Sequence, residues 1–356
     1  MNSSESAQAP GPLAIDPHQT GDDSESTGVS RAAAELAFHG ATKVYAGRRT
    51  PAVSELTLEV AAGEICVLIG PSGSGKTTAM QMVNRLIPMT SGEITIDGSD
   101  TKSLDETELR RGIGYVFQQI GLFPHMTTED NIATVPRLLG WSKDRIRARA
   151  RELLELVGLD PDEDLRRYPG EFSGGQRQRI GVARAMAADQ PLMLMDEPFG
   201  ALDPITRDRL QDDFLRLHEE LPKTVVFVTH DIDEAIKMGH RIAILRDGEL
   251  VQYDTPDRIL AEPANEFVAD FVGADRGLKR LRVWRLGDLE LDPAPGDGTA
   301  GLTAREDMSL RDALSIMLVE GKERLTVLDA EDRPKGAIAL DDITRLIGPQ
   351  SRTVQT

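Results

Sequence analysis

The apolar positions along the chain fall into two patterns: short runs of strand length, and longer stretches in which apolar residues recur at helical spacing. The first pattern predicts strands and the second predicts helices. Strands are expected at residues 36–47, 52–60, 63–70, 191–198 and 223–230. A short hairpin is expected at residues 91–98, and two strands joined by a D-G turn at residues 241–255. Helices are expected at residues 75–87, 143–189 and 206–221. Because strands alternate with helices, the pattern predicts an α/β fold with a mainly parallel sheet.

The two ends of the chain depart from this pattern. The N-terminus is rich in Ser, Gly, Pro and acidic residues and is expected to be disordered. After about residue 275, a basic segment and a Gly-, Pro- and Asp-rich linker precede a stretch that reads as helix, strand, turn, strand and helix. The expected parts are a tail at 1–33, a main domain at 34–272 with a helical subdomain at about 119–184, a basic junction and linker at 273–301, a small α+β module at 302–347 and a tail at 348–356.

Composition and charge narrow the classes of function. Of 356 residues 40% are hydrophobic, and no apolar stretch approaches the roughly 20 residues that a membrane-spanning helix needs. The N-terminus has neither the basic start nor the apolar core of a secretory signal. The net charge of −18 disfavours a general nucleic-acid binder, whose affinity rests on basic contacts to phosphates. The single cysteine, Cys66, excludes an intrachain disulfide and is expected to be a buried packing residue.

The stretch GPSGSGKTT, residues 70–78, follows directly on the apolar run ICVLI. It fits the pattern G-x-x-x-x-G-K-[ST], in which glycines let backbone N–H groups turn toward phosphates. Lys76 adds a positive charge, and Thr77 offers a hydroxyl to Mg²⁺. The N-terminus of the following helix is itself favourable for phosphate. The chain is therefore expected to bind a nucleoside triphosphate.

Two further stretches indicate that the nucleotide is hydrolysed. LMLMDEP places Asp196 and Glu197 at the end of a strand. In such sites the first acid holds Mg²⁺, usually through water, and a second acid can polarise the attacking water. Upstream, FSGGQ at residues 172–176 can present a hydroxyl and backbone donors to a second phosphate face.

Together these motifs resemble the nucleotide-binding subunit of an ATP-binding cassette (ABC) transporter. The resemblance covers residues 34 to about 272 and rests on four elements in the family's order: the phosphate loop, YVFQQ, FSGGQ, and LMLMDEPFGALD followed by FVTHD. FSGGQ is similar to the family signature, with Phe172 where leucine is commoner. The resemblance implies a P-loop nucleotide-binding domain with a helical subdomain, and an enzyme that hydrolyses ATP with Mg²⁺.

The resemblance also implies a role for each matching residue. Glu197 would be the general base, and His230 would hold the attacking water and bond the γ-phosphate. Gln118 would sense Mg²⁺ and the γ-phosphate, with Gln119 as the second candidate. The implied catalytic set is Glu197, His230, Gln118 and Lys76, and the implied Mg²⁺ set is Thr77, Gln118 and Asp196. The implied nucleotide-binding set is Tyr45, stacking on adenine, with Gly70, Pro71, Ser72, Gly73, Ser74, Gly75, Lys76, Thr77, Thr78, Ser173, Gly174, Gly175, Gln176 and, at a dimer seam, Asp203.

In this family the signature of one subunit faces the phosphate loop of its twin. The resemblance therefore implies a homodimer that closes on ATP and docks on two separate permease subunits near Gln118 and residues 120–132. The expected place is the cytoplasmic face of the cell membrane, reached through the permease. Bacterial importers of this type also use an extracytoplasmic substrate-binding protein.

The segment after the main domain bears on the cargo. PANEFVADFVGADRGLKRL, residues 263–281, closely resembles the corresponding stretch of importers for glycine betaine, carnitine, choline and proline betaine. In those importers cystathionine-β-synthase-type (CBS) modules follow, and residues 309–343 look like one such module. The resemblance implies import of quaternary amines. One alternative is the same motor with an amino acid, a sulfonate or a polyamine as cargo; another is a soluble ABC ATPase outside transport.

Two features of the C-terminal region leave its role open. Only one CBS unit is found, so a pair would have to form across two chains. Ala339 stands three residues before Asp342, where nucleotide-binding versions usually carry Thr or Ser. The junction carries a basic run, which is interpreted as a contact with anionic lipid, a solvated helix face or a contact with the permease. The run consists of Arg276, Lys279, Arg280, Arg282 and Arg285.

Overall fold

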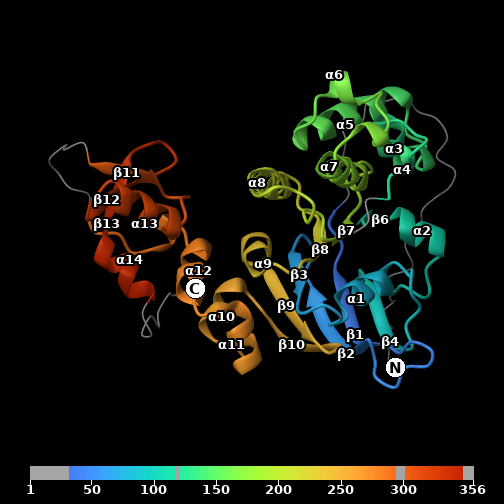
Figure 1. Cartoon of the computed structure of the whole chain (residues 1–356), viewed down its shortest axis with the longest axis horizontal. Helices are drawn as coiled ribbons and strands as arrows, with labels where there is room; N and C mark the ends of the chain where they lie inside the picture. Colours follow the sequence, from blue (N-terminus) through green and yellow to red (C-terminus); the bar gives the residue numbers. More distant parts are fainter. Residues whose placement is uncertain (1–31, 118–120, 294–300, 348–356) are drawn as a thin grey trace, which may run out of the picture.

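The computed structural model describes residues 32–117, 121–293 and 301–347, whose elements are arranged as in Figure 1. The predicted C-terminal tail and all but the last two residues of the predicted N-terminal tail lie outside these ranges. So do Gln118 and Gln119, which the sequence makes candidates for the Mg²⁺ site.

A six-stranded sheet in the order β10-β9-β3-β8-β7-β6 forms the centre of the main domain. Its strands are β3 (Ile65–Ile69), β6 (Ile113–Val116), β7 (Leu192–Asp196), β8 (Thr224–Val228), β9 (Arg241–Arg246) and β10 (Glu249–Asp254). All neighbours pair in parallel except β9 and β10, which are antiparallel. Val67 and Leu68 of β3 point into two different apolar cores, so both faces of the sheet are buried. The predicted mainly parallel sheet is confirmed.

The first predicted strands form a second sheet, which is antiparallel. It has the order β2-β1-β4-β5 and consists of β1 (Leu36–Lys43), β2 (Val53–Val60), β4 (Ser91–Ile96) and β5 (Ser99–Asp100). Helix α1 (Lys76–Val83) packs into the core that the two sheets share. It ends four residues before the predicted boundary at 87, because Arg85 adopts a left-handed φ of 56°. The phosphate loop, which precedes α1, is thus held between two sheets.

Most of the other helices of this domain pack on the face of the central sheet away from β1 and β2, and α2 packs on the opposite face through Leu109. The segment predicted to be a helical subdomain, drawn in green in Figure 1, contains α3 (Thr128–Ile132), α4 (Thr134–Leu138), α5 (Lys143–Leu156), α6 (Pro161–Asp164), the 3₁₀ turn η1 (Pro169–Glu171) and α7 (Gly174–Ala185). The other helices of the domain are α2 (Glu106–Arg111), α8 (Pro204–Glu220), α9 (Ile232–Met238), α10 (Pro256–Ala261) and α11 (Glu266–Val272). Within the described ranges, no helix combines the length and the apolar character needed to cross a bilayer.

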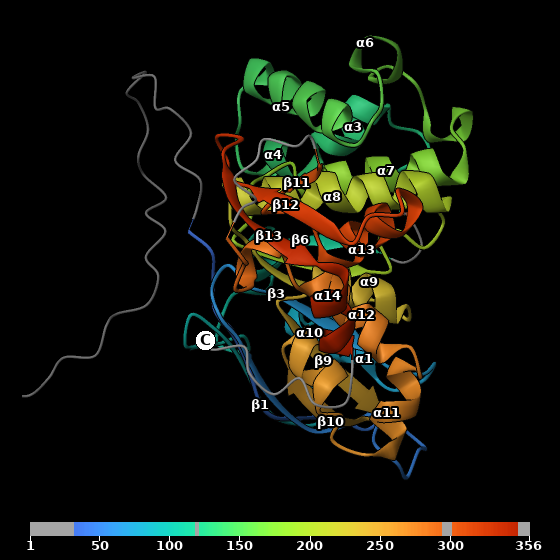
Figure 2. The ribbon, with the colours of Figure 1, turned by 90° about the vertical axis from the view of Figure 1, so that its left-hand side faces the viewer.

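The C-terminal residues form a small module around a three-stranded sheet, seen face-on in Figure 2. Its elements are β11 (Leu302–Arg305), α13 (Leu310–Val319), β12 (Arg324–Leu328), β13 (Pro334–Ala339) and α14 (Leu340–Ile347). The order helix, strand, strand, helix agrees with the prediction, and β11 is an additional strand. The junction before the module is not only a linker, because it contains α12 (Arg276–Val283) and the 3₁₀ turn η2 (Leu286–Asp288).

Candidate functional site

The phosphate loop joins the end of β3 to the start of α1 and depends on two glycines. A Cβ atom on Gly70 would lie 2.0 Å from the backbone oxygen of Leu245, and one on Gly75 would lie 2.4 Å from that of Ala52. Gly75 also has a φ of 99°, in the region that other residues rarely adopt. Only glycine fits these positions, so the backbone can turn tightly beside Lys76.

Lys76 is the first residue of α1 and is buried. Its Nζ donates to the backbone oxygens of Gly70 at 2.8 Å and Pro71 at 2.9 Å. Burial lowers the pKa of Lys76, while the carboxylates of Glu197 and Asp196 act in the opposite direction. The loop therefore keeps a cation at its centre with two acids facing it.

Asp196 ends β7 opposite the phosphate loop and is 4% exposed. The Thr77 hydroxyl donates to its Oδ1 at 3.3 Å. Burial raises the pKa of Asp196 to about 6; the Thr77 hydrogen bond opposes this rise and the charge of Glu197 adds to it. No group of three or more His, Cys, Asp or Glu side chains in the described residues could hold a metal ion. A cation beside Asp196 would therefore need hydroxyl or phosphate oxygens as further ligands.

Glu197 follows Asp196 and faces His230 across the end of β8. Its φ of 46° is strained for a residue with a side chain. Its N–H donates to the backbone oxygen of Val228 at 2.9 Å, which holds the strained residue in place. Glu197 Oε1 lies 3.2 Å from Nδ1 of His230, whose side chain is 69% exposed. The structure thus brings the predicted base and the predicted histidine into contact.

Gln178 is a residue of this site that sequence reasoning missed. Its side chain is 5% exposed and bridges two points of the loop after β7. Nε2 donates to the backbone oxygen of Glu197 at 2.9 Å, and Oε1 accepts from the N–H of Ala201 at 2.9 Å. Gln178 therefore connects α7 to the backbone that holds Glu197. Its position four residues before the buried Val182, on the same face of α7, is the signal that could have found it.

An open cavity of about 500 Å³ lies at the phosphate loop, a size typical of small-molecule sites. It is lined by Tyr45, Arg48, Ala52, Gly73, Gly75, Lys76, Thr77 and Thr78. The Tyr45 hydroxyl lies 3.4 Å from Oγ1 of Thr78. Six predicted nucleotide-binding residues therefore surround one cavity. Arg48, which was not predicted, adds a positive charge at its edge.

The signature residues are arranged around the start of α7. Ser173 Oγ accepts from the N–H of Gln176 at 3.2 Å, and Gln176 Oε1 accepts from the N–H of Ser173 at 2.9 Å. This capping box fixes the helix start and places Gly174 and Gly175 in the first turn. No signature residue is among the described residues that line the cavity of the same chain.

The remaining predicted residues lie at the tip of the phosphate loop and at the start of α8. Pro71 and Ser72 are exposed at the tip, whereas Ser74 is buried with Oγ 3.4 Å from Nζ of Lys76. Asp203 caps α8 by accepting from the N–H of Thr206 at 3.0 Å. Hydrogen bonds from Thr206 lower the pKa of Asp203, so its carboxylate is ionised at neutral pH.

Comparison with known proteins identifies the family. A family model described as "ABC transporter" matches residues 53–200. The osmoprotectant import ATP-binding protein OsmV of Salmonella typhimurium is 52% identical over 292 residues, which cover 82% of this chain and 75% of OsmV. The chain belongs to the ABC transporter family. This confirms the family predicted from the motifs and its ATP-hydrolysing class.

Two further ABC proteins extend the comparison. The glycine betaine/carnitine/choline transport ATP-binding protein OpuCA of Bacillus subtilis is 51% identical over 309 residues, which cover 86% of this chain and 79% of OpuCA. A solved dimer of the ATP-binding cassette MJ0796, in a post-hydrolysis state with ADP and Pi, is 36% identical with a TM-score of 0.57. The match covers 62% of this chain and 98% of the MJ0796 chain. These relatives support a transport ATPase rather than a soluble ABC ATPase outside transport.

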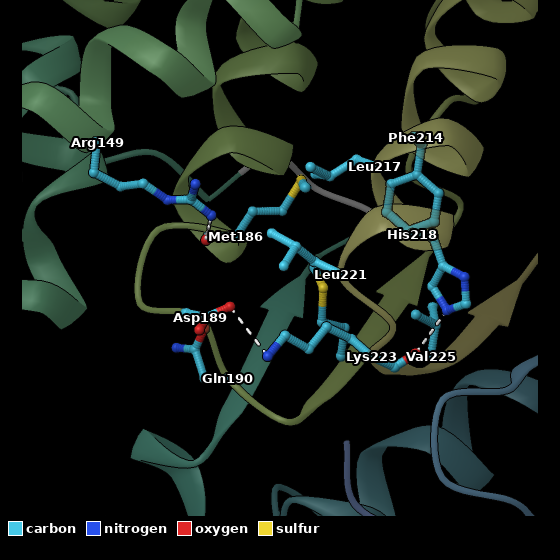
Figure 3. Close-up of a pocket in the computed structure, with 11 residues that line it drawn as sticks. Arg149, Met186, Asp189, Gln190, Phe214, Leu217, His218, Leu221, Lys223 and Val225 are labelled. Atoms are coloured by element: carbon cyan, nitrogen blue, oxygen red, sulfur yellow. Dashed lines mark hydrogen bonds and ion pairs between the residues drawn. The ribbon is translucent and has the colours of Figure 1, made fainter. Parts of the chain in front are cut away.

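A second cavity of the ABC domain lies at the amino ends of β7 and β8, away from the phosphate loop (Figure 3). Lys223 Nζ pairs with Asp189 Oδ1 at 3.1 Å, and the Lys223 backbone oxygen lies 2.8 Å from Nε2 of His218. Apolar side chains fill most of the rest, including Phe214 and Leu217 of α8. The space of about 40 Å³ suits water-sized molecules and excludes a nucleotide. We interpret it as a packing seam between α8 and the helical region.

Proposed function

We propose that this ABC subunit hydrolyses ATP to power the import of quaternary-amine osmoprotectants such as glycine betaine, carnitine, choline and proline betaine. The observation that carries hydrolysis is the contact between Glu197 and His230 beside Asp196. The cargo is supported by relatives at 51–52% identity whose names specify osmoprotectant or glycine betaine, carnitine and choline transport. An amino acid, a sulfonate or a polyamine is the alternative cargo for the same motor.

The residues at the phosphate loop divide the chemistry among them. Lys76 and the loop N–H groups would bind the phosphate oxygens of ATP, and Tyr45 would stack on adenine. Glu197 would accept a proton from the attacking water while the oxygen of that water bonds to the γ-phosphorus. The bond between the γ-phosphorus and the oxygen that bridges it to the β-phosphate would break, which releases ADP and phosphate. His230 would hold Glu197 and the γ-phosphate in line. The 3.2 Å contact between these two side chains supports that arrangement.

Mg²⁺ fits the oxygen atoms that the site presents. The Thr77 hydroxyl and the Asp196 carboxylate lie 3.3 Å apart, and both are ligands that this ion prefers. Bound Mg²⁺ would neutralise phosphate charge during transfer. We also propose Gln118 as a ligand, on the resemblance of YVFQQ alone, because it lies outside the described residues. Burial disfavours an ionised Asp196, and a nearby divalent cation would offset that cost.

We further propose that a complete site needs two copies of the chain. The signature lies outside the cavity of its own chain, and the solved relative with ADP and Pi is a dimer. Ser173, Gly174, Gly175 and Gln176 of one copy would then donate to the γ-phosphate bound by the other. Asp203 would lie at the seam between the copies.

We propose that the chain works in transport together with further subunits. We propose two permease subunits at the cytoplasmic face of the membrane and an extracytoplasmic substrate-binding protein. The exposed aromatic rings of Phe117, next to Gln118, and of Phe123, within residues 120–132, support a permease contact there. The exposed Arg276 and Arg285 are the junction residues that we propose for a contact with anionic lipid.

The C-terminal module is proposed to be a single CBS-like unit that pairs across two chains. Its strands β12 and β13 flanked by α13 and α14 support that assignment. Asp342 occupies the position expected to bind ribose, but its Oδ2 accepts from the N–H of Ala339 at 3.3 Å. The acid therefore caps its own helix, which favours a structural role over nucleotide sensing.

The cargo proposal is tested by uptake of radiolabelled glycine betaine. The chain would be expressed with its permease and binding protein in cells that lack other carriers for this solute. We expect uptake with the wild-type chain, competition by unlabelled carnitine or choline, and no uptake with Glu197→Gln. Uptake that is equal with and without the chain, or competition only by an amino acid, sulfonate or polyamine, would contradict the proposal.

A further inference from the structure

Helix α12 belongs to two packed units at once. Leu281 is fully buried in the core of the C-terminal module, where Trp284 and Leu286 join it. Val283 packs against this core and also against the main core of the ABC domain. In Figure 1, α12 lies between α10 and the module. Any shift of the module therefore moves α12 relative to the ABC domain.

Two arginines of α12 form ion pairs with the ABC domain. Arg280 Nε donates to Oδ1 of Asp257 on α10 at 2.9 Å, and its guanidinium lies 4.5 Å from the ring centre of Trp284. Arg282 Nη1 donates to Oδ1 of Asp233 on α9 at 3.1 Å. These two residues of the basic run thus act within the chain, through partners far away in the sequence.

The pair between Arg282 and Asp233 is close to the catalytic histidine. Helix α9 starts at Ile232, two residues after His230. Between them, Asp231 caps the helix by accepting at Oδ1 from the N–H groups of Asp233 and Glu234. Asp233 therefore lies in the first turn of the helix that His230 precedes, and its carboxylate reaches outward to α12.

The other side of the same turn is anchored to α8. Glu234 Oε1 accepts from Nε2 of Gln211 on that helix at 2.8 Å. The start of α9 is thus held between α8, which follows the Glu197 loop, and α12, which belongs to the C-terminal module. The His230 side chain itself is mostly exposed and touches Glu197. Its position therefore depends on where α9 lies.

We propose that Arg282 is a positioning residue for His230: by holding Asp233, it fixes the start of α9 and keeps the histidine against Glu197. The inference rests on the role proposed for His230 in hydrolysis. It couples the C-terminal module to the hydrolytic site through α12, because Leu281 of this helix is buried in the module core. Arg282 does not line the cavity at the phosphate loop, so it acts on the rate of hydrolysis and not on ATP binding.

The test is a double-mutant cycle in the full-length chain, with steady-state ATPase kinetics as the readout. Asp233→Asn keeps the shape of the side chain and removes its charge. Arg282→Gln removes the positive charge and shortens the side chain, while keeping a polar end group. We expect each variant to lower kcat about twofold to fivefold, the size set by a partly exposed ion pair. KM for ATP stays unchanged, and the double variant is no slower than either single one. Arg282→Lys, which keeps the charge, retains most of the wild-type kcat.

The control is Arg305→Ala, which removes a surface ion pair with Asp332 inside the module and leaves kcat unchanged. Wild-type kcat in Arg282→Gln, or additive losses in the double variant, would overturn the positioning role. A lower melting temperature with an unchanged kcat would also overturn it, since the pair would then be structural only. Absence of ATPase activity in the wild-type chain would instead contradict the proposed function.

Discussion

The nucleotide site and the C-terminal module are stabilised in different ways. At the nucleotide site, Lys76 and Asp196 are buried charges and Glu197 holds a strained backbone conformation. In the module the core is apolar, and charged pairs such as Arg305 with Asp332 lie at the surface. Buried charge and backbone strain both oppose folding. The nucleotide site therefore depends on the two sheets around it, whereas the module is stable through its own packing.

The largest effect is expected at Glu197, where function depends on one carboxylate. Glu197→Gln keeps the shape of the side chain but cannot accept a proton, so kcat should fall by about 100-fold or more. ATP binding, measured by fluorescent nucleotide titration, should remain within about twofold of wild type, because the phosphate loop is unchanged. A near-normal kcat would mean that another residue is the general base. The nucleotide site would then no longer differ from the C-terminal module in depending on a single carboxylate.

The next effect tests whether packing alone maintains the module. Met317 is fully buried in its core, and Met317→Ala should cost about 3 kcal/mol of unfolding free energy through the cavity it leaves. Leu318, the next residue, is 62% exposed, and Leu318→Ala should stay within about 0.5 kcal/mol. Urea unfolding followed by Trp284 fluorescence, in a Trp141→Phe background, gives both values. Equal costs for the two variants would contradict the burial pattern.

A smaller change in stability, which depends on pH, is expected from substitution of Asp196. Its pKa of about 6 in the folded chain lies above the ordinary aspartate value of 3.8. As pH rises, the Asp196 carboxyl therefore ionises at a lower pH in the unfolded chain than in the folded chain. The free energy of unfolding decreases as pH rises from about 4 to about 6. In the absence of nucleotide and Mg²⁺, Asp196→Asn should raise the free energy of unfolding by about 2 kcal/mol at pH 8 and very little near pH 4. Stabilisation that is independent of pH would contradict a burial penalty on the carboxylate.

The same contrast explains how much the sequence could predict. The phosphate loop, Asp196 and Glu197 were predictable because their geometry comes from a few consecutive residues at a strand end. Gln178 and Arg48 were missed, since a polar residue in a polar run gives little indication of what it contacts. The second, antiparallel sheet was not predicted, because apolar alternation predicts strands but not their partners.

The junction shows the clearest limit of sequence reasoning. Its basic residues suggested solvent, lipid or the permease, but Arg280 and Arg282 pair with Asp257 and Asp233. Those acids lie 23 and 49 residues away in sequence, and nothing local marks them as partners. The packing of α12 against α9 and α10 brings the charges together.

Two copies of the chain are proposed to complete each ATP site, with the signature of one facing the phosphate loop of the other. The most direct measurement is the mass of Glu197→Gln in solution, by size-exclusion chromatography with light scattering. Without nucleotide the chain should run near its monomer mass of 38.9 kDa, and with ATP near about twice that value. Adding Ser173→Arg to the same chain should leave ATP binding intact but keep it monomeric. ATP-dependent dimers of equal amount with and without Ser173→Arg would contradict the account.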